Sequence, residues 1–285
     1  MNDEAGFILQ EARIAIVGLG LMGGSLALAL HGKCAALLGV EPDASACEQA
    51  LSRGIVSQAG ADPREILPQV DVVILAAPVP AILAYLEELP GLMPKPCILL
   101  DLGSSKYDIV QAMQALPERF DPLGGHPLAG KERLSLANAD AELYKGAPFF
   151  LCPLERTSAR ARACAGQIVA ALGAQAIEVE PAVHDAALAA TSHLPYLICS
   201  ALALATPSEA APFVGSGYRS TARLAGTPQS MMFGVLKSNR ANVLEAVRRF
   251  QAELSNLASA IEDGDDEALG FLLDAAQKQY YGLVR

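Results

Sequence analysis

The sequence has no tryptophan, and aromatic residues make up only 5% of its 285 residues. Charged residues are also few, at 18%, whereas hydrophobic residues reach 52%. Disordered chains have the opposite composition, so we expect a folded protein. A chain of this length forms one large domain or two domains of ordinary size. The 21 basic residues are outnumbered by 31 acidic ones and form no cluster, which argues against nucleic acid as a partner.

Cysteine is sparse as well. The six cysteines are scattered, form no C-x-x-C pair and have no spacing with histidine that suits a metal. We therefore expect reduced thiols in a cytoplasmic protein without a metal site. The N-terminus lacks the basic start of a secretory signal, and the longest apolar stretches, 72–86 and 194–205, are broken by proline or too short to cross a bilayer. We expect no membrane segment.

Short apolar runs alternate with helical patterns before residue 181. The runs are predicted to be strands, at 13–18, 35–40, 70–76, 97–102, 149–152 and 176–179, and the first of them is predicted to be buried on both faces. The segments between them that are predicted to be helices include 25–31, 44–53, 81–89 and 158–172. This alternation predicts an α/β fold of the Rossmann type, with a parallel, doubly wound sheet.

After residue 181 only helical patterns remain. They cover 182–205, a long helix that starts at Thr227-Pro228 and ends near Gly264, and 267–283. The sequence therefore predicts an NAD(P)-binding domain at 1–181 and an all-helical domain at 182–285. The long helix would either form an oligomer interface or fold back on its own domain.

A G-x-G-x-x-G pattern joins the first predicted strand to the first helix. It consists of Gly18, Leu19, Gly20, Leu21, Met22 and Gly23. Gly18 permits a tight turn, Gly20 lets the backbone approach a pyrophosphate, and Gly23 lets helix and strand pack closely. The helix N-terminus adds unpaired N–H groups, so this context predicts a dinucleotide site.

Glu41 ends the second predicted strand, where a carboxylate that binds the ribose belongs. A carboxylate accepts hydrogen bonds from the ribose 2′-hydroxyl and repels a 2′-phosphate. No arginine follows to bind that phosphate. The sequence therefore favours NAD over NADP, and FAD, which uses the same loop, stays open.

Four polar clusters are candidates for chemistry. They are 103–106 (GSSK) after the fourth predicted strand, 124–130 (GGHPLAG) in a predicted loop, 191–195 (TSHLP) in a helix, and 217–225 (GYRSTARLA). Each also has a structural interpretation, as a helix cap, a core histidine or a surface charge. Pro195 lacks the N–H that would bond to the Thr191 carbonyl, so the helix should be disturbed beside His193. His31 and His184 are interpreted as structural.

Together these patterns resemble the prephenate dehydrogenase family, which includes arogenate and cyclohexadienyl dehydrogenases. The matching segments span the chain: 18–25, 103–106, 124–132, 184–185 with 192–195, and 220–225. The resemblance implies a Rossmann domain that binds NAD(P), a helical domain that forms a homodimer, and a site between them. It also implies oxidative decarboxylation of prephenate to 4-hydroxyphenylpyruvate, or of arogenate to tyrosine.

The predicted roles follow from that reaction. Removal of hydride from C4 of the substrate ring requires an acceptor for the C4 hydroxyl proton, and His126 suits this because imidazole is neutral and basic near pH 7. The family match places Ser104 on the same hydroxyl. It assigns Arg223 to the ring carboxylate, which a guanidinium pairs in a bidentate manner.

Three further residues are predicted to bind substrate. His193 would make a polar contact, Lys106 would supply positive potential for a dianion, and Arg219 belongs to the same motif as Arg223. The sequence departs from the family pattern at Ser105, Ser135, Ser220 and Phe233. Because these positions border the expected binding region, the choice between prephenate and arogenate stays open.

Two alternatives have a different chemistry. The first is another two-domain dehydrogenase, such as a 3-hydroxyacid dehydrogenase, which places a catalytic lysine on a helix of the second domain. Residues 182–205 contain no lysine, which counts against it. The second is a non-catalytic NAD sensor, which would not need His126, His193 and Arg223 together.

Overall fold

The computed structural model describes residues 6–131 and 135–284. Within them, one sheet of eight strands has the order β3-β2-β1-β4-β5-β6-β7-β8. The strands are β1 (Arg13–Val17), β2 (Ala36–Val40), β3 (Gln58–Gly60), β4 (Val72–Leu75), β5 (Cys97–Asp101), β6 (Phe120–Pro127), β7 (Pro148–Pro153) and β8 (Gln175–Glu178). The order reverses between β1 and β4, and this switch point is where open α/β sheets bind ligands.

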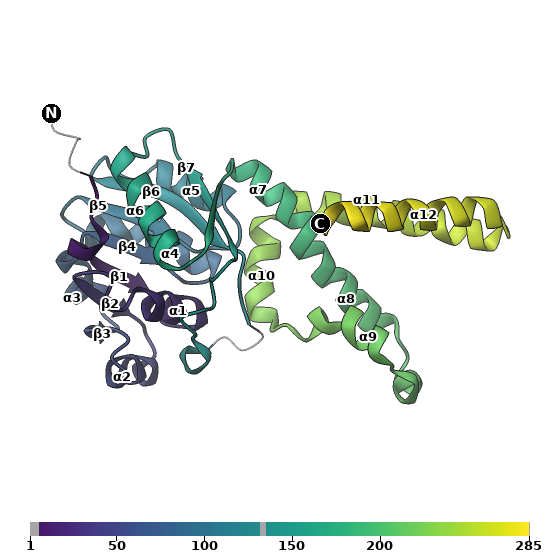
Figure 1. The fold of residues 1–285 in the computed structure, drawn as a ribbon, viewed down its shortest axis with the longest axis horizontal. Coiled ribbons are helices and arrows are strands. Elements are labelled where there is room, and N and C mark those ends of the chain that lie inside the picture. Colours follow the sequence, from purple (N-terminus) through teal and green to yellow (C-terminus); the bar gives the residue numbers. More distant parts are fainter. Residues whose placement is uncertain (1–5, 132–134, 285) are drawn as a thin grey trace.

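Helices cover both faces of the sheet and then form the C-terminal region (Figure 1). Those of the sheet region are α1 (Leu21–Leu30), α2 (Ala44–Ser52), α3 (Pro63–Ile66), α4 (Val79–Leu92), α5 (Tyr107–Gln114) and α6 (Ala159–Ala171). The C-terminal ones are α7 (Pro181–Leu188), α8 (Leu194–Ala205), α9 (Ser216–Thr221), α10 (Gln229–Ser238), α11 (Arg240–Glu262) and α12 (Asp266–Leu283). A π-helical turn, Ala189–His193, joins α7 to α8.

The sheet is parallel from β3 to β6, as predicted, whereas β7 runs antiparallel to β6 and β8 runs parallel to β7. Alternate side chains of β1 enter two different clusters. Ile14 and Ile16 pack on the side of α1 and α6, and Ala15 and Val17 on the side of α4 and α5. The Rossmann-type α/β prediction is therefore confirmed, because the central strands β1, β4 and β5 are buried on both faces, whereas the last strand, β8, is exposed.

Two strands were not predicted, β3 and β6. β3 is a short edge strand without an apolar run. β6 contains the glycine-rich segment expected as a loop, so His126 lies at the end of a strand. The glycines are needed there: a Cβ on Gly125 would come within 2.6 Å of the Asp101 carbonyl oxygen, and one on Gly124 within 2.9 Å of Val110 Cγ2.

The long helix predicted from Thr227 to Gly264 is two helices, and this prediction is corrected. The chain breaks at Asn239, between α10 and α11. Asn239 is buried, and its Nδ2 donates to the Asp185 carbonyl oxygen at 2.7 Å. A tertiary contact thus interrupts a continuous apolar periodicity. The start of α10 is also one residue later than expected, because Pro228 is the N-cap.

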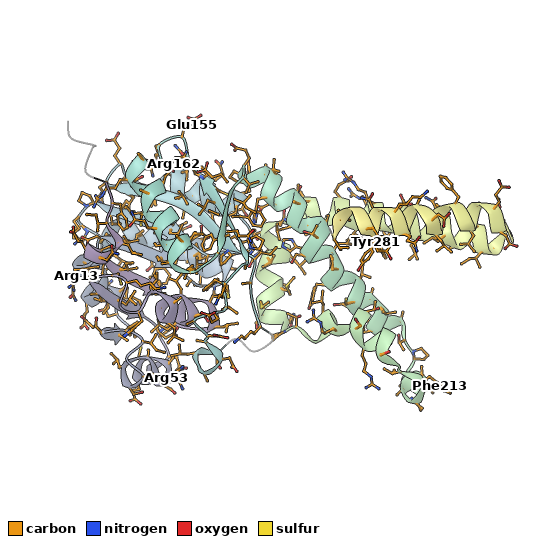
Figure 2. All side chains as sticks on the ribbon, in the orientation of Figure 1. Arg13, Arg53, Glu155, Arg162, Phe213 and Tyr281 are labelled. Atoms are coloured by element: carbon orange, nitrogen blue, oxygen red, sulfur yellow. The ribbon has the colours of Figure 1, made fainter. Side chains whose placement is uncertain are left out.

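The helical region extends away from the sheet in two projections, one built from α8 and α9 and the other from α11 and α12 (Figure 1). Phe213 lies at the far end of the first, and Tyr281 lies on α12 (Figure 2). By length and composition alone, the run Pro181–Ala205 is apolar enough to cross a membrane, a weak criterion that core helices of other proteins also meet. Three polar side chains of this run, His184, Asp185 and His193, are buried within the protein.

Candidate active site

The glycine loop has the geometry of a phosphate cradle. Gly18 has a φ of 97°, and a Cβ there would come within 2.5 Å of the Ala76 carbonyl oxygen. A Cβ on Gly23 would overlap the Gly18 carbonyl oxygen. Gly20 is the N-cap of α1, so the helix N-terminus opens onto the loop. Leu19 and Leu21 are buried, and the loop therefore fits a dinucleotide through its backbone.

Glu41 follows β2 and is directed at this loop. Its Oε2 accepts the Leu19 N–H at 2.8 Å, and its Oε1 accepts the Asp43 N–H at 3.1 Å. Each carboxylate oxygen keeps a second lone pair for a ribose hydroxyl. The half-buried carboxylate is thus held against the glycine loop.

Asp101 ties the ends of β5 and β6 together. Its Oδ2 accepts the Gly103 N–H at 2.7 Å, and its Oδ1 accepts the Gly125 N–H at 3.0 Å. These bonds hold the segment that contains Ser104 next to the strand end that carries His126. Ser104 itself is half-buried. Asp101 was not predicted from the sequence to belong to the site, although an acidic residue at the end of an apolar strand could have indicated it.

Lys106 lies inside the protein rather than on the surface of the site. Its side chain is fully buried, forms an ion pair with Asp101 and donates to the Gly125 carbonyl oxygen at 2.7 Å. This placement does not support the predicted substrate contact. The ammonium acts instead from beneath the site, on the charge state of the neighbouring His126.

His126 is buried and linked to a second histidine. Its Nδ1 lies 2.9 Å from Nε2 of His184, whose Nδ1 lies 2.7 Å from Oδ1 of Asp185. Burial lowers the pKa of His126 well below 6.5, and the positive charge of the nearby Lys106 lowers it further. His126 is therefore neutral at pH 7, as a general base must be. His184 was interpreted as structural, and its contact with His126 could be found only in three dimensions.

His193 ends the π-helical turn, so the disturbance predicted beside Pro195 is confirmed. Its Nδ1 lies 3.3 Å from Nδ2 of Asn239. Burial is the main cause that lowers its pKa to about 4, while Asp185 opposes and His184 adds to this shift. A neutral His193 that accepts from Asn239 at Nδ1 carries its proton on Nε2 and is a donor there.

Arg223 lines a cavity of about 580 Å³ between the two parts of the chain. The segment after β6 contributes Gly130 and Lys131, and the helical part contributes Met231. Gly130 is four residues beyond His126 in the sequence, and His126 itself does not line this cavity. Arg219 is not among the lining residues, and its Nη2 donates to the Val214 carbonyl oxygen at 2.9 Å. Glu132, in the motif 124–132, lies outside the described residues.

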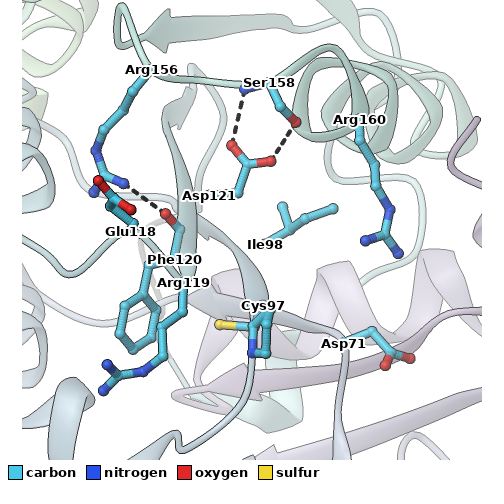
Figure 3. Close-up of a pocket in the computed structure, with 11 residues that line it drawn as sticks. Asp71, Cys97, Ile98, Glu118, Arg119, Phe120, Asp121, Arg156, Ser158 and Arg160 are labelled. Atoms are coloured by element: carbon cyan, nitrogen blue, oxygen red, sulfur yellow. Dashed lines mark hydrogen bonds between the residues drawn. The ribbon is translucent and has the colours of Figure 1, made fainter. Parts of the chain in front are cut away.

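Another cavity, of about 600 Å³, opens at the opposite edge of the sheet (Figure 3). It lies where β5 and β6 begin, beside Cys97 and Phe120, and Asp121 there bonds to Ser158 of the α6 N-terminus. Ligands of α/β sheets bind at the carboxyl ends of strands, so this cavity is not the candidate active site. Within the described parts of the chain, no group of three or more potential metal ligands occurs.

A glycine cradle at the switch point, a buried neutral histidine at the carboxyl edge of the sheet, and a cavity lined by both parts of the chain together define a two-domain, dinucleotide-dependent dehydrogenase. The chain belongs to the prephenate dehydrogenase family. Residues 26–178 match the model of the prephenate dehydrogenase nucleotide-binding domain, and residues 180–275 match that of the prephenate dehydrogenase dimerization domain.

Named relatives agree with this assignment. The prephenate dehydrogenase of Bacillus subtilis is 28% identical over 268 residues, which cover 90% of this chain and 72% of that protein. The crystal structure of arogenate dehydrogenase from Synechocystis has a TM-score of 0.82 at 30% identity and covers 95% of this chain and 100% of that one. Prephenate dehydrogenase from A. aeolicus, in complex with hydroxyphenyl propionate and NAD+, has a TM-score of 0.86 at 25% identity over 94% of this chain and 97% of that one.

Proposed function

We propose that this enzyme oxidatively decarboxylates prephenate to 4-hydroxyphenylpyruvate, arogenate to tyrosine, or both, in tyrosine biosynthesis. The observation that carries the proposal is the buried His126, neutral at pH 7, beside the Ser104 segment in a member of the prephenate dehydrogenase family. A non-catalytic NAD sensor would have no use for a base at this place.

The proposed domain boundary stays near residue 181. The last strand, β8, ends at Glu178, and α7 begins at Pro181. Residues 1–181 would bind the coenzyme, and residues 182–285 would complete the substrate site and form the dimer. The exposed apolar side chains of the helical projections support a homodimer. Six free cysteines are consistent with a cytoplasmic location.

The chemistry is assigned as follows. The glycine loop 18–23 would hold NAD, which would supply the acceptor for the hydride that leaves C4 of the substrate. His126 Nε2, the ring nitrogen not engaged by His184, takes the C4 hydroxyl proton as the carbonyl character develops. Ser104 donates to or accepts from the same hydroxyl and orients it. The C1 carboxylate then leaves as CO2, its bonding electrons complete the aromatic ring, and this makes the reaction effectively irreversible.

Substrate anions are assigned to the cavity between the two parts of the chain. Arg223 would pair with the ring carboxylate, and His193 would donate from Nε2 to a polar group of the substrate. Arg219 is exposed and does not line this cavity, so its predicted contact with the substrate has less support than that of Arg223. Lys106 would act only through its charge and its hold on the strand that carries His126.

The coenzyme is proposed to be NAD rather than NADP. The support is the position of Glu41, whose carboxylate is bonded to the N–H of Leu19 in the glycine loop. A 2′-phosphate would meet a negative charge there, whereas a 2′-hydroxyl would meet an acceptor.

The test is to follow NADH or NADPH formation with prephenate and arogenate in parallel, each with NAD and with NADP. We expect turnover with at least one substrate and a clear preference for NAD. Binding of NAD without turnover on either substrate would overturn the proposal in favour of a sensor.

A further inference from the structure

We propose that His184 and Asp185 are positioning residues that hold His126 in the one tautomer able to act as a base. This inference rests on the proposed function, in which Nε2 of His126 accepts the substrate proton. The observation behind it is an unbroken chain of short contacts from the Asp185 carboxylate through His184 to His126.

With His184 neutral, the protons along this chain have one consistent assignment. Asp185 also accepts the N–H of Lys106 at 2.7 Å and the N–H of Tyr107 at 2.9 Å. Burial alone would raise the pKa of Asp185, but the hydrogen bonds from His184, Tyr107 and Lys106 outweigh it and lower the pKa. Asp185 is therefore ionised at pH 7 and is an acceptor only.

Because the Asp185 carboxylate can only accept hydrogen bonds, it determines which ring nitrogen of each histidine carries the proton. His184 must carry a proton on Nδ1 to bond with the carboxylate, so in its neutral form its Nε2 is an acceptor. His126 must then donate from Nδ1 to that nitrogen. Its single proton is used in this bond, and Nε2 keeps its lone pair for the substrate hydroxyl.

The same chain stabilises the product of proton transfer. When His126 Nε2 takes the hydroxyl proton, the ring becomes an imidazolium whose Nδ1–H still points to His184. The Lys106 ammonium disfavours this cation, and Asp185 is the negative group of the hydrogen-bonded series Asp185–His184–His126. The Asp185 carboxylate orients His184 and makes its Nε2 a better acceptor, and His184 in turn orients His126. An acid orients the catalytic imidazole of hydrolases in a similar way.

Two substitutions at His184 test the proposal. In His184→Gln, the side-chain oxygen reaches as far as the original Nε2 and still accepts from His126 Nδ1. In His184→Leu, no acceptor remains. We expect kcat to fall about 10- to 100-fold in the leucine variant with KM nearly unchanged, and to recover largely in the glutamine variant. His31→Gln, at an exposed position, is the matched control.

The direct readout is the 15N chemical shift of the His126 ring nitrogens, recorded on histidine-labelled, substrate-free protein at pH 7. Wild type and His184→Gln should show a protonated Nδ1 and an unprotonated Nε2, whereas His184→Leu should show the other tautomer or a mixture. A protonated Nε2 in the wild-type protein would overturn the proposal, and so would an unchanged tautomer and kcat in His184→Leu. Because this measurement needs no substrate, it fails or succeeds separately from the turnover assay.

Discussion

The two regions of this molecule differ in how they are held together. The sheet region buries two large apolar clusters, one on each face of the sheet, and each buried aliphatic side chain contributes roughly 1.5–3 kcal/mol. The described part of the helical region has a small cluster around Ala189, Val243 and Ala246. Most of the exposed large apolar side chains lie in this helical region. The sheet region is therefore stabilised by its own core, whereas the helical region needs contacts with other parts of the protein to bury its apolar side chains.

These contacts are made with two neighbours. The sheet region is one, because Asp185 of α7 bonds to Lys106 and Tyr107, and Ser238 of α10 bonds to Ser105 at 2.7 Å. The other is the second copy of the chain in the proposed homodimer, which would cover exposed apolar side chains of α11 and α12. In the proposed mechanism the stable region supplies the base and the dependent region supplies the substrate clamp.

The largest effect is expected from His126→Asn in the sheet region. Asparagine can bond to the substrate hydroxyl but cannot take its proton, so kcat should fall about 10²–10⁴-fold while KM changes little. In wild type, kcat/KM should stay level as pH falls through 6.5 and decline only at lower pH, because burial holds the pKa of His126 well below that value. This acid limb should vanish in the variant. A folded variant with near-wild-type kcat would remove His126 as the base.

Arg223→Lys tests the contribution of the helical region. A point charge does not reproduce the planar fork of the guanidinium, so KM should rise about 10- to 100-fold with a smaller change in kcat. Arg219→Lys is the matched control, since Arg219 lies outside the cavity lining. Equal KM values for wild type and a folded Arg223→Lys protein would take Arg223 out of the site.

The dependence of the helical region on a second copy is tested on α11. Leu254 and Ile261 are more than half exposed and lie seven residues apart, on one face of the helix. Leu254→Asp or Ile261→Asp should weaken the dimer by about tenfold or more, because a carboxylate would be buried in an apolar contact. Sedimentation over a concentration series measures this. Gln277→Asp, at an exposed polar position, should have no effect, and dimers of unchanged strength in all three variants would contradict the prediction.

The smallest effect is expected at the coenzyme site. Glu41→Ser removes both the acceptor for the 2′-hydroxyl and the repulsion of a 2′-phosphate, so the preference for NAD over NADP should shrink by about tenfold. The ratio of kcat/KM for the two coenzymes measures it. A wild-type enzyme that already prefers NADP would show that the interpretation of Glu41 is wrong.

The sequence by itself determined the features that depend on local pattern. Apolar runs and turn residues predicted six strands and the Rossmann-type order, and the spacing of Gly18, Gly20 and Gly23 located the cradle. The proline after His193 predicted the disturbed helix. These features follow from the periodicity and backbone preferences of neighbouring residues, which the sequence displays directly.

Only the tertiary structure decided what depends on distant partners. β6 has no apolar periodicity at its glycines, because the Asp101 carbonyl oxygen and the Val110 side chain occupy the space where side chains of residues 125 and 124 would lie. Asn239 interrupts an apolar repeat to bond with Asp185, which is 54 residues away. His184 looked like any buried histidine until its contact with His126 was known, since a hydrogen bond between residues 58 apart leaves no mark in either local sequence.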